Sequence, residues 1–198
     1  MLSKKEIISA LKEGKVIVYP TDTVYGLICN ARSKIAVRRL FRIKKRSLEK
    51  AIPVFVQDVK MAKKFAHINK KQEEFLKKVW PGKVTCVLKA KKKFPQGVLE
   101  KDGTIGLRIP RHKALNQLIL NSNLPLSATS ANIAGKPAST KIKNIINQFN
   151  KEKFQPDLII NAGNLKPSKP STVVDLTVKK LKILRRGAIK KKDLPQLL

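Results

Sequence analysis

Apolar residues recur along the chain with two spacings, one typical of amphipathic helices and the other of β-strands. Intervals of three and four residues predict helices in six segments: 3–14, 33–46, 58–66, 69–80, 112–122 and 141–150. The first helix has a clear start, because Ser3 and Glu6 form the two halves of a capping box. Gly14, which tolerates the left-handed conformation of a helix terminus, marks its end.

Strand patterns fill the intervals between the helices. Runs of β-branched and apolar residues predict strands within 15–20, 52–56, 83–90, 103–110, 124–132, 157–163, 171–178 and 181–188. The run KVIVYP alternates too little to have a face in water, so we expect it to be a central strand. Because helices and strands interleave without a repeat or a linker, the sequence predicts an α/β fold with a mixed sheet, in a single domain of residues 1–198.

Length and composition are those of a chain with a substantial core. The chain has 198 residues, 42% of them apolar, and no apolar run approaches the roughly 20 residues that a membrane helix needs. The N-terminal stretch MLSKKEIISALKEG has charges within its apolar pattern, so we expect no secretory signal. Cys29 and Cys86 match neither a metal-binding nor a disulfide spacing. These features favour a cytoplasmic protein without membrane association.

The net charge is strongly positive, since 44 Lys and Arg residues against 13 Asp and Glu residues give +31. Such a charge suits a polyanionic partner such as RNA or nucleotide phosphates, but lysines scattered over a solvated surface would give the same total. Only nine of the basic residues are arginines. Arginine offers a planar fork for carboxylates and phosphates, so the positions of the arginines are more informative than the total charge.

Several common site motifs are absent. GKPAST resembles the end of a phosphate-binding loop, but Pro137 follows the lysine and Ser130 replaces the first glycine. The chain has no G-x-G-x-x-G or G-x-S-x-G sequence, and His67 and His112 stand in no metal or catalytic-triad pattern. The sequence therefore gives no support to a zinc site, a dinucleotide-binding fold or a serine hydrolase.

Four polar stretches remain, and each lies where a predicted strand ends. They are PTDTVYG (20–26), IKKRSLEKAIP (43–53), TIGLRIP (104–110) together with SATSAN (127–132), and PSTVVD (170–175) followed by ILRRG (183–187). Taken singly, each is explained by an ordinary turn, helix end or strand start. Ligands of α/β proteins bind where strand ends and their loops converge, so together the four stretches predict a polar binding pocket.

The order of these stretches resembles that of the YrdC-like family, whose members are threonylcarbamoyl-AMP synthases acting in tRNA modification. The resemblance extends from VIVYPTDTVYGL through WPGKVTCVL, TIGLRIP and LSATSANIAGKP to STVVDLT and ILRRGAI. The family's K-x-R signature stands here as Lys44-Lys45-Arg46, and its S-x-N signature as Ser130-Ala131-Asn132. The resemblance implies a twisted, open, mixed sheet with flanking helices around a basic cavity, in a short form without the C-terminal domain of longer relatives.

The resemblance also implies a reaction, in which L-threonine, bicarbonate or CO2, and ATP give threonylcarbamoyl-adenylate and pyrophosphate. The product would serve the N6-threonylcarbamoyladenosine modification at position 37 of tRNA, through downstream threonylcarbamoyl-transferase proteins. Mg2+ would accompany ATP through its phosphate oxygens, without a metal site of the protein's own. No residue is an obvious nucleophile or general base, so catalysis would depend on positioning and electrostatics.

The same resemblance implies a role for each site residue. Those implied to bind threonine are Thr21, Arg108 and Ser171. Those implied to bind ATP are Lys44, Arg46, Lys50, Thr104, Ser130, Asn132 and Arg185, of which Lys44, Arg46, Ser130 and Asn132 would also be catalytic. An arginine fork and small hydroxyl groups suit the carboxylate and hydroxyl of threonine, and fixed cations suit a triphosphate.

Two other interpretations explain parts of the sequence. The net charge also fits a non-catalytic basic protein of the same fold that binds tRNA or double-stranded RNA, and we expect RNA contact through the basic surface in either case. The second interpretation is a related carbamoyl-transfer domain, as found in hydrogenase-maturation proteins, but the acylphosphatase and zinc segments of those chains are missing here.

The sequence departs from the family pattern at Ser47, Lys83, Ala134 and Arg186. Because Arg186 adjoins Arg185, either could face the nucleotide, and the spacing to Ser171 favours Arg185.

Overall fold

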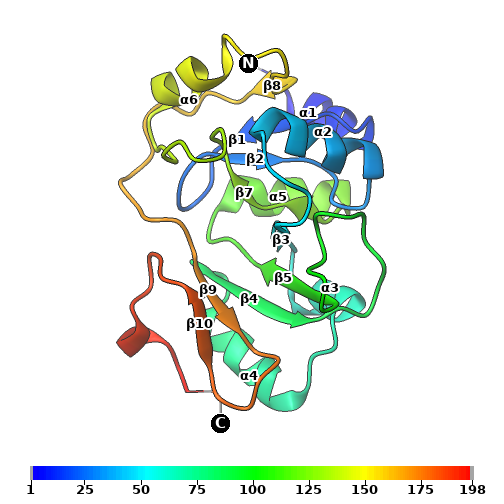
Figure 1. The fold of residues 1–198 in the computed structure, drawn as a ribbon, viewed down its shortest axis with the longest axis vertical. Coiled ribbons are helices and arrows are strands. Elements are labelled where there is room, and N and C mark those ends of the chain that lie inside the picture. The colour runs from blue at the N-terminus through cyan, green and yellow to red at the C-terminus, as the bar shows by residue number, and fades with distance from the viewer. Residues whose placement is uncertain (1, 197–198) are drawn as a thin grey trace.

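Two mixed β-sheets, one above the other in Figure 1, form the framework of the structure, a computed structural model that describes residues 2–196. The upper sheet has four strands in the order β7-β2-β1-β8. Their bounds are Ile17–Tyr19 for β1, Gly26–Ile28 for β2, Thr129–Ser130 for β7 and Leu158–Ile159 for β8. β1 pairs antiparallel with β2 and parallel with β8, so the strand expected to be central does have a neighbour on each side.

The lower sheet has six strands in the order β10-β9-β4-β5-β3-β6. Their bounds are Val54–Phe55 for β3, Val84–Lys89 for β4, Thr104–Arg108 for β5, Leu126–Ser127 for β6, Thr172–Asp175 for β9 and Lys182–Arg185 for β10. β4 pairs parallel with β9 and antiparallel with β5, and β5 pairs parallel with β3. The predicted α/β class with open, mixed pairing is confirmed, but the strands form two sheets rather than one.

The chain passes from one sheet to the other within a short stretch. Only Ala128 separates β6 from β7, yet β6 pairs with β3 in the lower sheet and β7 with β2 in the upper one. Ala128 donates its backbone N–H to the carbonyl of Pro53 at this junction. The apolar pattern reports burial and not strand partners, so it does not reveal the break between the sheets. It also gives no sign of β2, because three residues are too few to show a period.

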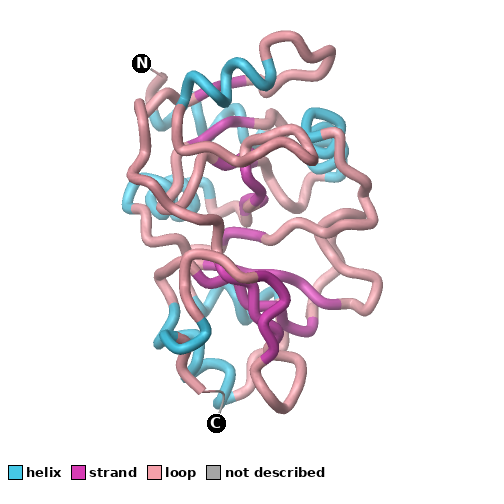
Figure 2. Tube along the Cα trace, turned by 60° about the vertical axis from the view of Figure 1, so that its left-hand side comes forward, coloured by secondary structure: helices cyan, strands magenta, loops and turns pink. Residues whose placement is uncertain are grey.

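Helices flank both sheets (Figures 1 and 2). They are α1 (Lys4–Lys12), α2 (Lys34–Lys44), α3 (Val59–Phe65), α4 (Lys70–Val79), α5 (Lys113–Ser122) and α6 (Ile142–Phe149), followed by the 3-10 turn η1 (Lys191–Asp193). All six α-helices lie within the predicted helical segments. α1, α2, α5 and α6 lie in the upper half of the molecule, and α3 and α4 in the lower half (Figure 1). The capping box of α1 is confirmed, because Ser3 donates its N–H to Glu6 at 2.7 Å and its hydroxyl accepts from the Glu6 N–H.

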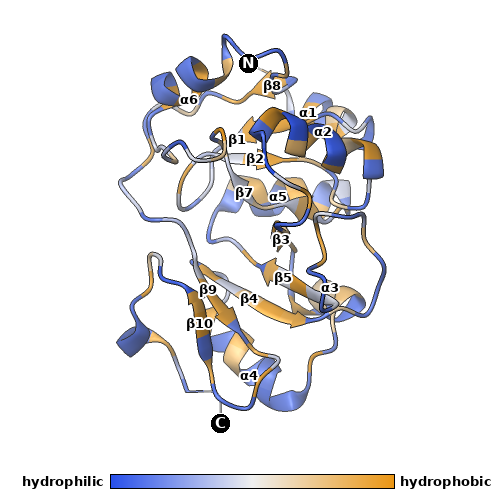
Figure 3. Ribbon diagram, in the orientation of Figure 1, coloured by the Kyte–Doolittle hydropathy of each residue, from blue (hydrophilic) through white to orange (hydrophobic). Residues whose placement is uncertain are grey.

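Most strands are built from apolar residues, whereas polar residues gather on the helices and loops (Figure 3). Some polar groups are nevertheless buried: within residues 2–196, twelve polar or charged residues are nearly inaccessible to solvent. Nine of these twelve line a single cavity between the sheets. Burying polar groups is unfavourable unless they have partners, so such a concentration indicates a functional site.

Candidate functional site

The cavity between the two sheets has a volume of about 1020 Å³. Its walls come from β2 and β7 of the upper sheet, from β3, β4, β5, β9 and β10 of the lower sheet, from the end of α2, and mainly from the loops after β1 and α2. It is lined by all ten residues that the sequence nominates: Thr21, Lys44, Arg46, Lys50, Thr104, Arg108, Ser130, Asn132, Ser171 and Arg185. Arg186 is not among the lining residues. The fold thus brings the four polar stretches together.

Lys44 joins the K-x-R segment to the S-x-N segment. It is the last residue of α2 and is only 3% exposed. Its ammonium group donates to the Ser130 carbonyl at 2.6 Å, to Asn132 Oδ1 at 2.8 Å and to the Asn132 carbonyl at 3.1 Å. An ammonium group has three N–H donors, so these contacts use all of them. Burial and, to a lesser degree, the charge of Arg46 lower the pKa of Lys44 to about 7.

The 130–132 loop has further internal hydrogen bonds. Ser130 Oγ donates to Asn132 Oδ1 at 2.6 Å. The Asn132 amide group donates to the carbonyls of Ile133 and Lys136 at 2.9 and 2.6 Å. Lys44 and Asn132 together hold this loop in one conformation at the cavity wall.

Arg46 and Arg185 form a positively charged part of the cavity. Arg46 donates from Nε to the Lys50 carbonyl at 3.0 Å and from Nη2 to the Ala51 carbonyl at 3.2 Å, and Arg185 donates from Nη2 to the Ser171 carbonyl at 2.7 Å. Within residues 2–196, neither arginine has an ion-pair partner. Burial lowers the pKa of both guanidinium groups, and the charge of Arg46 further lowers that of Arg185. These two cations therefore repel each other, which favours binding of a polyanion between them.

Hydroxyl groups at the start of β9 lie beside Arg185. Ser171 Oγ is 2.9 Å from Thr85 Oγ1 and 3.1 Å from Arg185 Nη2. The chain after Arg185 packs directly on this stretch, since a Cβ atom at Gly187 would overlap the backbone of Pro170 and Ser171. The lack of a side chain at Gly187 thus allows β10 to place Arg185 against Ser171.

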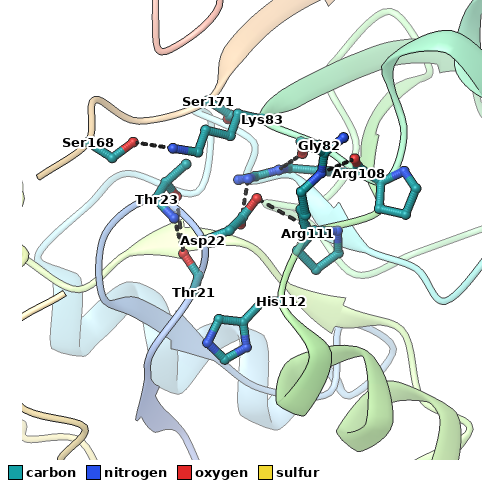
Figure 4. A network of polar contacts seen from close by, with 12 residues as sticks. Thr21, Asp22, Thr23, Gly82, Lys83, Arg108, Arg111, His112, Ser168 and Ser171 are labelled. Carbon is teal, nitrogen blue, oxygen red and sulfur yellow. Dashed lines mark hydrogen bonds and ion pairs between the residues drawn. The ribbon is translucent and has the colours of Figure 1, made fainter. Parts of the chain in front are cut away.

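Arg108, the last residue of β5, is held along one edge by other parts of the protein (Figure 4). Its Nε donates to the Gly82 carbonyl at 2.8 Å, and its Nη2 donates to Asp22 Oδ1 at 2.6 Å. The other carboxylate oxygen of Asp22 accepts the backbone N–H of Arg111 at 3.0 Å. Only 4% of the Arg108 side chain and 6% of the Asp22 side chain are exposed. Burial lowers the pKa of Arg108, and the charge of Asp22 opposes this effect.

Thr21 lines the cavity, but its hydroxyl group is used within its own loop. Thr21 Oγ1 donates to the Val24 carbonyl at 2.7 Å and accepts the backbone N–H of Thr23 at 3.1 Å. Thr23 Oγ1 also lies 3.1 Å from Thr21 Oγ1. Because the one donor of Thr21 is occupied, Thr23 Oγ1 is the donor of this pair, and its lone pairs are left for a ligand.

Thr104 and Lys50 also line the cavity. Thr104 Oγ1 donates to Asp102 Oδ1 at 2.7 Å, and this hydrogen bond is the main reason that the pKa of Asp102 is lowered. Lys50 is exposed, and its backbone carbonyl accepts from Arg46. Thr104 is thus held by a neighbouring carboxylate, whereas the Lys50 side chain extends into solvent.

Three residues of the site were given no role from the sequence: Asp22, Thr23 and Thr85. Asp22 and Thr23 lie within the polar stretch PTDTVYG (20–26), so their position in that stretch was the signal in the sequence that could have identified them. Thr85 lies in a strand made mostly of apolar residues, where threonine is common, so no local signal marks it.

Neither the histidines nor the cysteines contribute to the site. His112 caps α5 by accepting the Leu115 N–H at Nδ1, and burial lowers its pKa. Cys29 and Cys86 are buried free thiols, and burial raises the pKa of Cys29 to about 12. Within residues 2–196, no three His, Cys, Asp or Glu side chains gather in a way that could hold a metal ion. No helix in that range has the length and apolar character to span a membrane.

Comparison with known proteins adds independent information. Residues 9–187 match the Sua5/YciO/YrdC family, which is described as "telomere recombination". A putative threonylcarbamoyl-AMP synthase of Methanocaldococcus jannaschii is 36% identical over 186 residues, which are 94% of this chain and 84% of that protein.

Two solved structures share the fold. The crystal structure of P. abyssi Sua5 complexed with L-threonine matches with a TM-score of 0.85 and 32% identity, over 94% of this chain and 55% of that one. This chain thus spans little more than half of the P. abyssi protein. E. coli YciO matches with a TM-score of 0.86 and 29% identity, over 97% of this chain and 92% of that one. From the family match and the identity to the M. jannaschii relative, the chain belongs to the Sua5/YciO/YrdC family.

Proposed function

We propose that this protein makes threonylcarbamoyl-adenylate and pyrophosphate from L-threonine, bicarbonate or CO2, and ATP. The main observation in support is that one cavity contains arginines of two kinds. Arg108 is paired with Asp22, whereas Arg46 and Arg185 have no ion-pair partner within residues 2–196. A zwitterionic amino acid suits the first arrangement, and a triphosphate suits the second. The M. jannaschii relative named as a putative threonylcarbamoyl-AMP synthase and the threonine complex of P. abyssi Sua5 support the same assignment.

The threonine subsite would lie beside Arg108. Its guanidinium group would bind the threonine carboxylate through the N–H groups that Asp22 and Gly82 do not use. Ser171 and Thr23 would hydrogen-bond the threonine hydroxyl or amine, and Thr21 would act by ordering the loop that contains Thr23. A site that bonds a hydroxyl group rejects analogues without one, because its own polar groups are then left unpaired.

The nucleotide would occupy the part of the cavity lined by Arg46 and Arg185. The threonine amine adds to CO2 and loses a proton, and an oxygen of the resulting carbamate attacks the α-phosphorus of ATP. The bond from the α-phosphorus to the pyrophosphate oxygen breaks, and pyrophosphate leaves. The two arginines would stabilise the charge that develops on the phosphates.

The remaining residues nominated for the nucleotide would have supporting roles. Lys44 would act through the 130–132 loop that it holds, so that Ser130 and Asn132 are fixed beside the phosphates. Lys50 and Thr104 would complete the wall on the side of Arg46. In this scheme the catalytic effect of Lys44, Arg46, Ser130 and Asn132 comes from positioning and electrostatics rather than from proton transfer.

The wider role follows from the same proposal. Mg2+ would enter with ATP, bound mainly by phosphate oxygens. The adenylate would pass to threonylcarbamoyl-transferase proteins that modify tRNA, and the basic surface would offer a site for tRNA. We further propose that residues 1–198 act as one catalytic domain and that the protein works in the cytoplasm.

Pyrophosphate release tests the proposed function. It should be measured with ATP, L-threonine and bicarbonate together and after omission of each, with the adenylate product identified by mass spectrometry. We expect pyrophosphate and the adenylate only in the complete mixture. Equal release without threonine would instead indicate a simple ATPase. No release, combined with tight and salt-sensitive RNA binding, would favour the non-catalytic RNA-binding alternative.

A further inference from the structure

Asp22 distinguishes Arg108 from the other arginines of the cavity. Arg46 and Arg185 donate to backbone carbonyls, which carry no net charge. Arg108 donates to a carboxylate at 2.6 Å, and both members of this pair are buried. Within residues 2–196, Arg108 is therefore the one of these three arginines that forms an ion pair, although the charge of Glu100 also acts on Arg46.

The hydrogen bonds of Arg108 leave one of its edges free. A guanidinium group can grip a carboxylate along the edge formed by Nε and Nη2, or along the edge formed by Nη1 and Nη2. Gly82 and Asp22 occupy the first edge. Nη1 donates to no residue within 2–196, so the second edge is available to a ligand in the cavity that Arg108 lines.

Asp22 itself is held behind Arg108. It is not among the residues that line the cavity, and its second oxygen accepts the N–H of Arg111 (Figure 4). The pair also connects the two halves of the molecule, because Asp22 follows β1 of the upper sheet and Arg108 ends β5 of the lower one. Asp22 can therefore set both the orientation and the net charge of the Arg108 subsite without touching a ligand there.

We propose that Asp22 is a positioning and specificity-determining residue that makes the Arg108 subsite select a zwitterionic amino acid over a phosphate group. This inference rests on the proposed function. Asp22 fixes the Nη1–Nη2 edge toward the cavity, where it meets the amino-acid carboxylate. It also offsets the charge of Arg108, so the subsite favours a molecule of zero net charge over a polyphosphate, even though the charge of Arg185 acts on Arg108. Arg46 and Arg185, which form no ion pair within residues 2–196, then remain the place for the phosphates.

The substitution Asp22→Asn tests both parts of this inference, since it retains an acceptor oxygen but removes the charge. We expect threonine affinity to fall about tenfold, equivalent to the loss of one well-aligned charge-assisted hydrogen bond. We expect inorganic pyrophosphate not to compete with threonine in the unaltered protein and to become a competitor of threonine in the variant. ATP affinity should change less than about twofold. Calorimetric titrations of threonine, with and without pyrophosphate, and of ATP would measure these quantities.

Asp157→Asn is a matched control. The Asp157 carboxylate likewise accepts from an arginine, Arg39, at 2.7 Å and from the backbone N–H of Val16 at 2.8 Å, but Asp157 does not line the cavity and does not contact Arg108. The same substitution there should leave all three measurements unchanged. Equal losses in the two variants would show a general effect of removing a charged pair and would overturn the inference.

Two further variants separate position from charge. Asp22→Glu keeps the charge but displaces the carboxylate, so threonine affinity should fall while pyrophosphate still does not compete. Unchanged threonine affinity in this variant would overturn the positioning role. This test remains available even if Asp22→Asn does not fold. The double variant Asp22→Asn, Arg108→Lys should bind threonine no more weakly than Arg108→Lys alone, because Asp22 acts through Arg108. Additive losses of threonine affinity in the double variant would contradict an action of Asp22 through Arg108.

If the unaltered protein neither binds threonine nor releases pyrophosphate, the proposed function fails instead of the inference about Asp22.

Discussion

Lys44 Nζ lies 2.8 Å from Asn132 Oδ1, and this contact joins two motifs that are 88 residues apart in the chain. Two further hydrogen bonds to the carbonyls of Ser130 and Asn132 complete the set of donors on Lys44. The K-x-R and S-x-N signatures are thus one structural unit, in which the lysine holds the loop and the arginine faces the cavity. We expect a lysine so placed to affect both stability and ligand binding.

The buried position of Lys44 predicts a pH dependence of stability. Its pKa in the folded protein is about 7, below the value of about 10.4 for an unfolded chain. Between pH 7 and about 10 the folded protein has therefore lost a proton that the unfolded chain still binds. The free energy of unfolding consequently rises as the pH increases across this range, and it falls as the pH is lowered from 10 toward 7.

Denaturant unfolding at several pH values would measure this effect. Because one pKa unit corresponds to about 1.4 kcal/mol, the unaltered protein should gain about 2 kcal/mol between pH 7 and pH 9 relative to Lys44→Met. The variant has no group to titrate at this position, so it corrects for the many other lysines. Parallel pH profiles for the two proteins would mean that Lys44 stays charged when folded.

The adjacent arginines Arg185 and Arg186 allow a matched test of the nucleotide subsite. Only Arg185 lines the cavity and contacts Ser171. Arg185→Ala should weaken ATP binding by about one to two orders of magnitude, since a hydrogen bond to a charged group contributes roughly 1.5–3 kcal/mol. Arg186→Ala removes the same charge from the next position and should leave ATP affinity within about twofold, as measured by calorimetry. Equal losses in both would point to bulk charge.

Replacing Arg108 should weaken threonine binding rather than ATP binding, the reverse of the effect expected for Arg185→Ala. In Arg108→Lys the charge is kept, but a single ammonium group lacks the planar fork that contacts Gly82 and Asp22 along one edge and leaves a second edge to grip a carboxylate. Threonine affinity should fall by about one to two orders of magnitude, with little change for ATP. Lys92→Ala, a change at an exposed lysine, should affect neither ligand. A comparable loss of ATP binding in Arg108→Lys would contradict separate subsites.

Gly187 should be intolerant of a side chain. Its Cβ would overlap the backbone of Pro170 and Ser171, so Gly187→Ala must move β10 away from β9 and separate Arg185 from Ser171. We expect a lower melting temperature and at least about tenfold weaker ATP binding. Gly106→Ala, where the nearest atoms are 3.4 Å away, should cost less stability in the same thermal unfolding assay. Similar melting temperatures for Gly187→Ala and the unaltered protein would show that β10 adapts.

Substrate analogues test the hydroxyl groups of the threonine subsite. Valine has the shape of threonine but lacks its hydroxyl, so it would offer no hydrogen bond to the lone pairs of Thr23 and Ser171 that the protein leaves free. Pyrophosphate release with valine should have a kcat/KM at least about a hundredfold below that with threonine, and serine should lie between the two. Comparable rates for valine and threonine would show that these hydroxyl groups do not recognise the side chain.

Much of this protein is determined by the sequence alone. The six helices follow from the spacing of apolar residues and from local caps such as Ser3 with Glu6, which depend only on near neighbours in the chain. The polar stretches carry a resemblance to the YrdC-like family, and the ten residues that this resemblance nominated all line one cavity. The helices and the site residues could be predicted without coordinates, because both predictions depend only on residue type and on order along the chain.

The tertiary structure decided which of these residues are free and which are neutralised. No local pattern shows that β6 and β7 belong to different sheets. Nor does any local pattern show that the Lys44 N–H groups donate to the 130–132 loop or that Arg108 pairs with Asp22. Asp22 and Arg108 are 86 residues apart, and their ion pair exists only because two sheets bring β1 and β5 together. Hydrogen bonding and desolvation act over a few ångströms in space, so the charge and the free donors of each side chain depend on neighbours that the linear sequence does not identify.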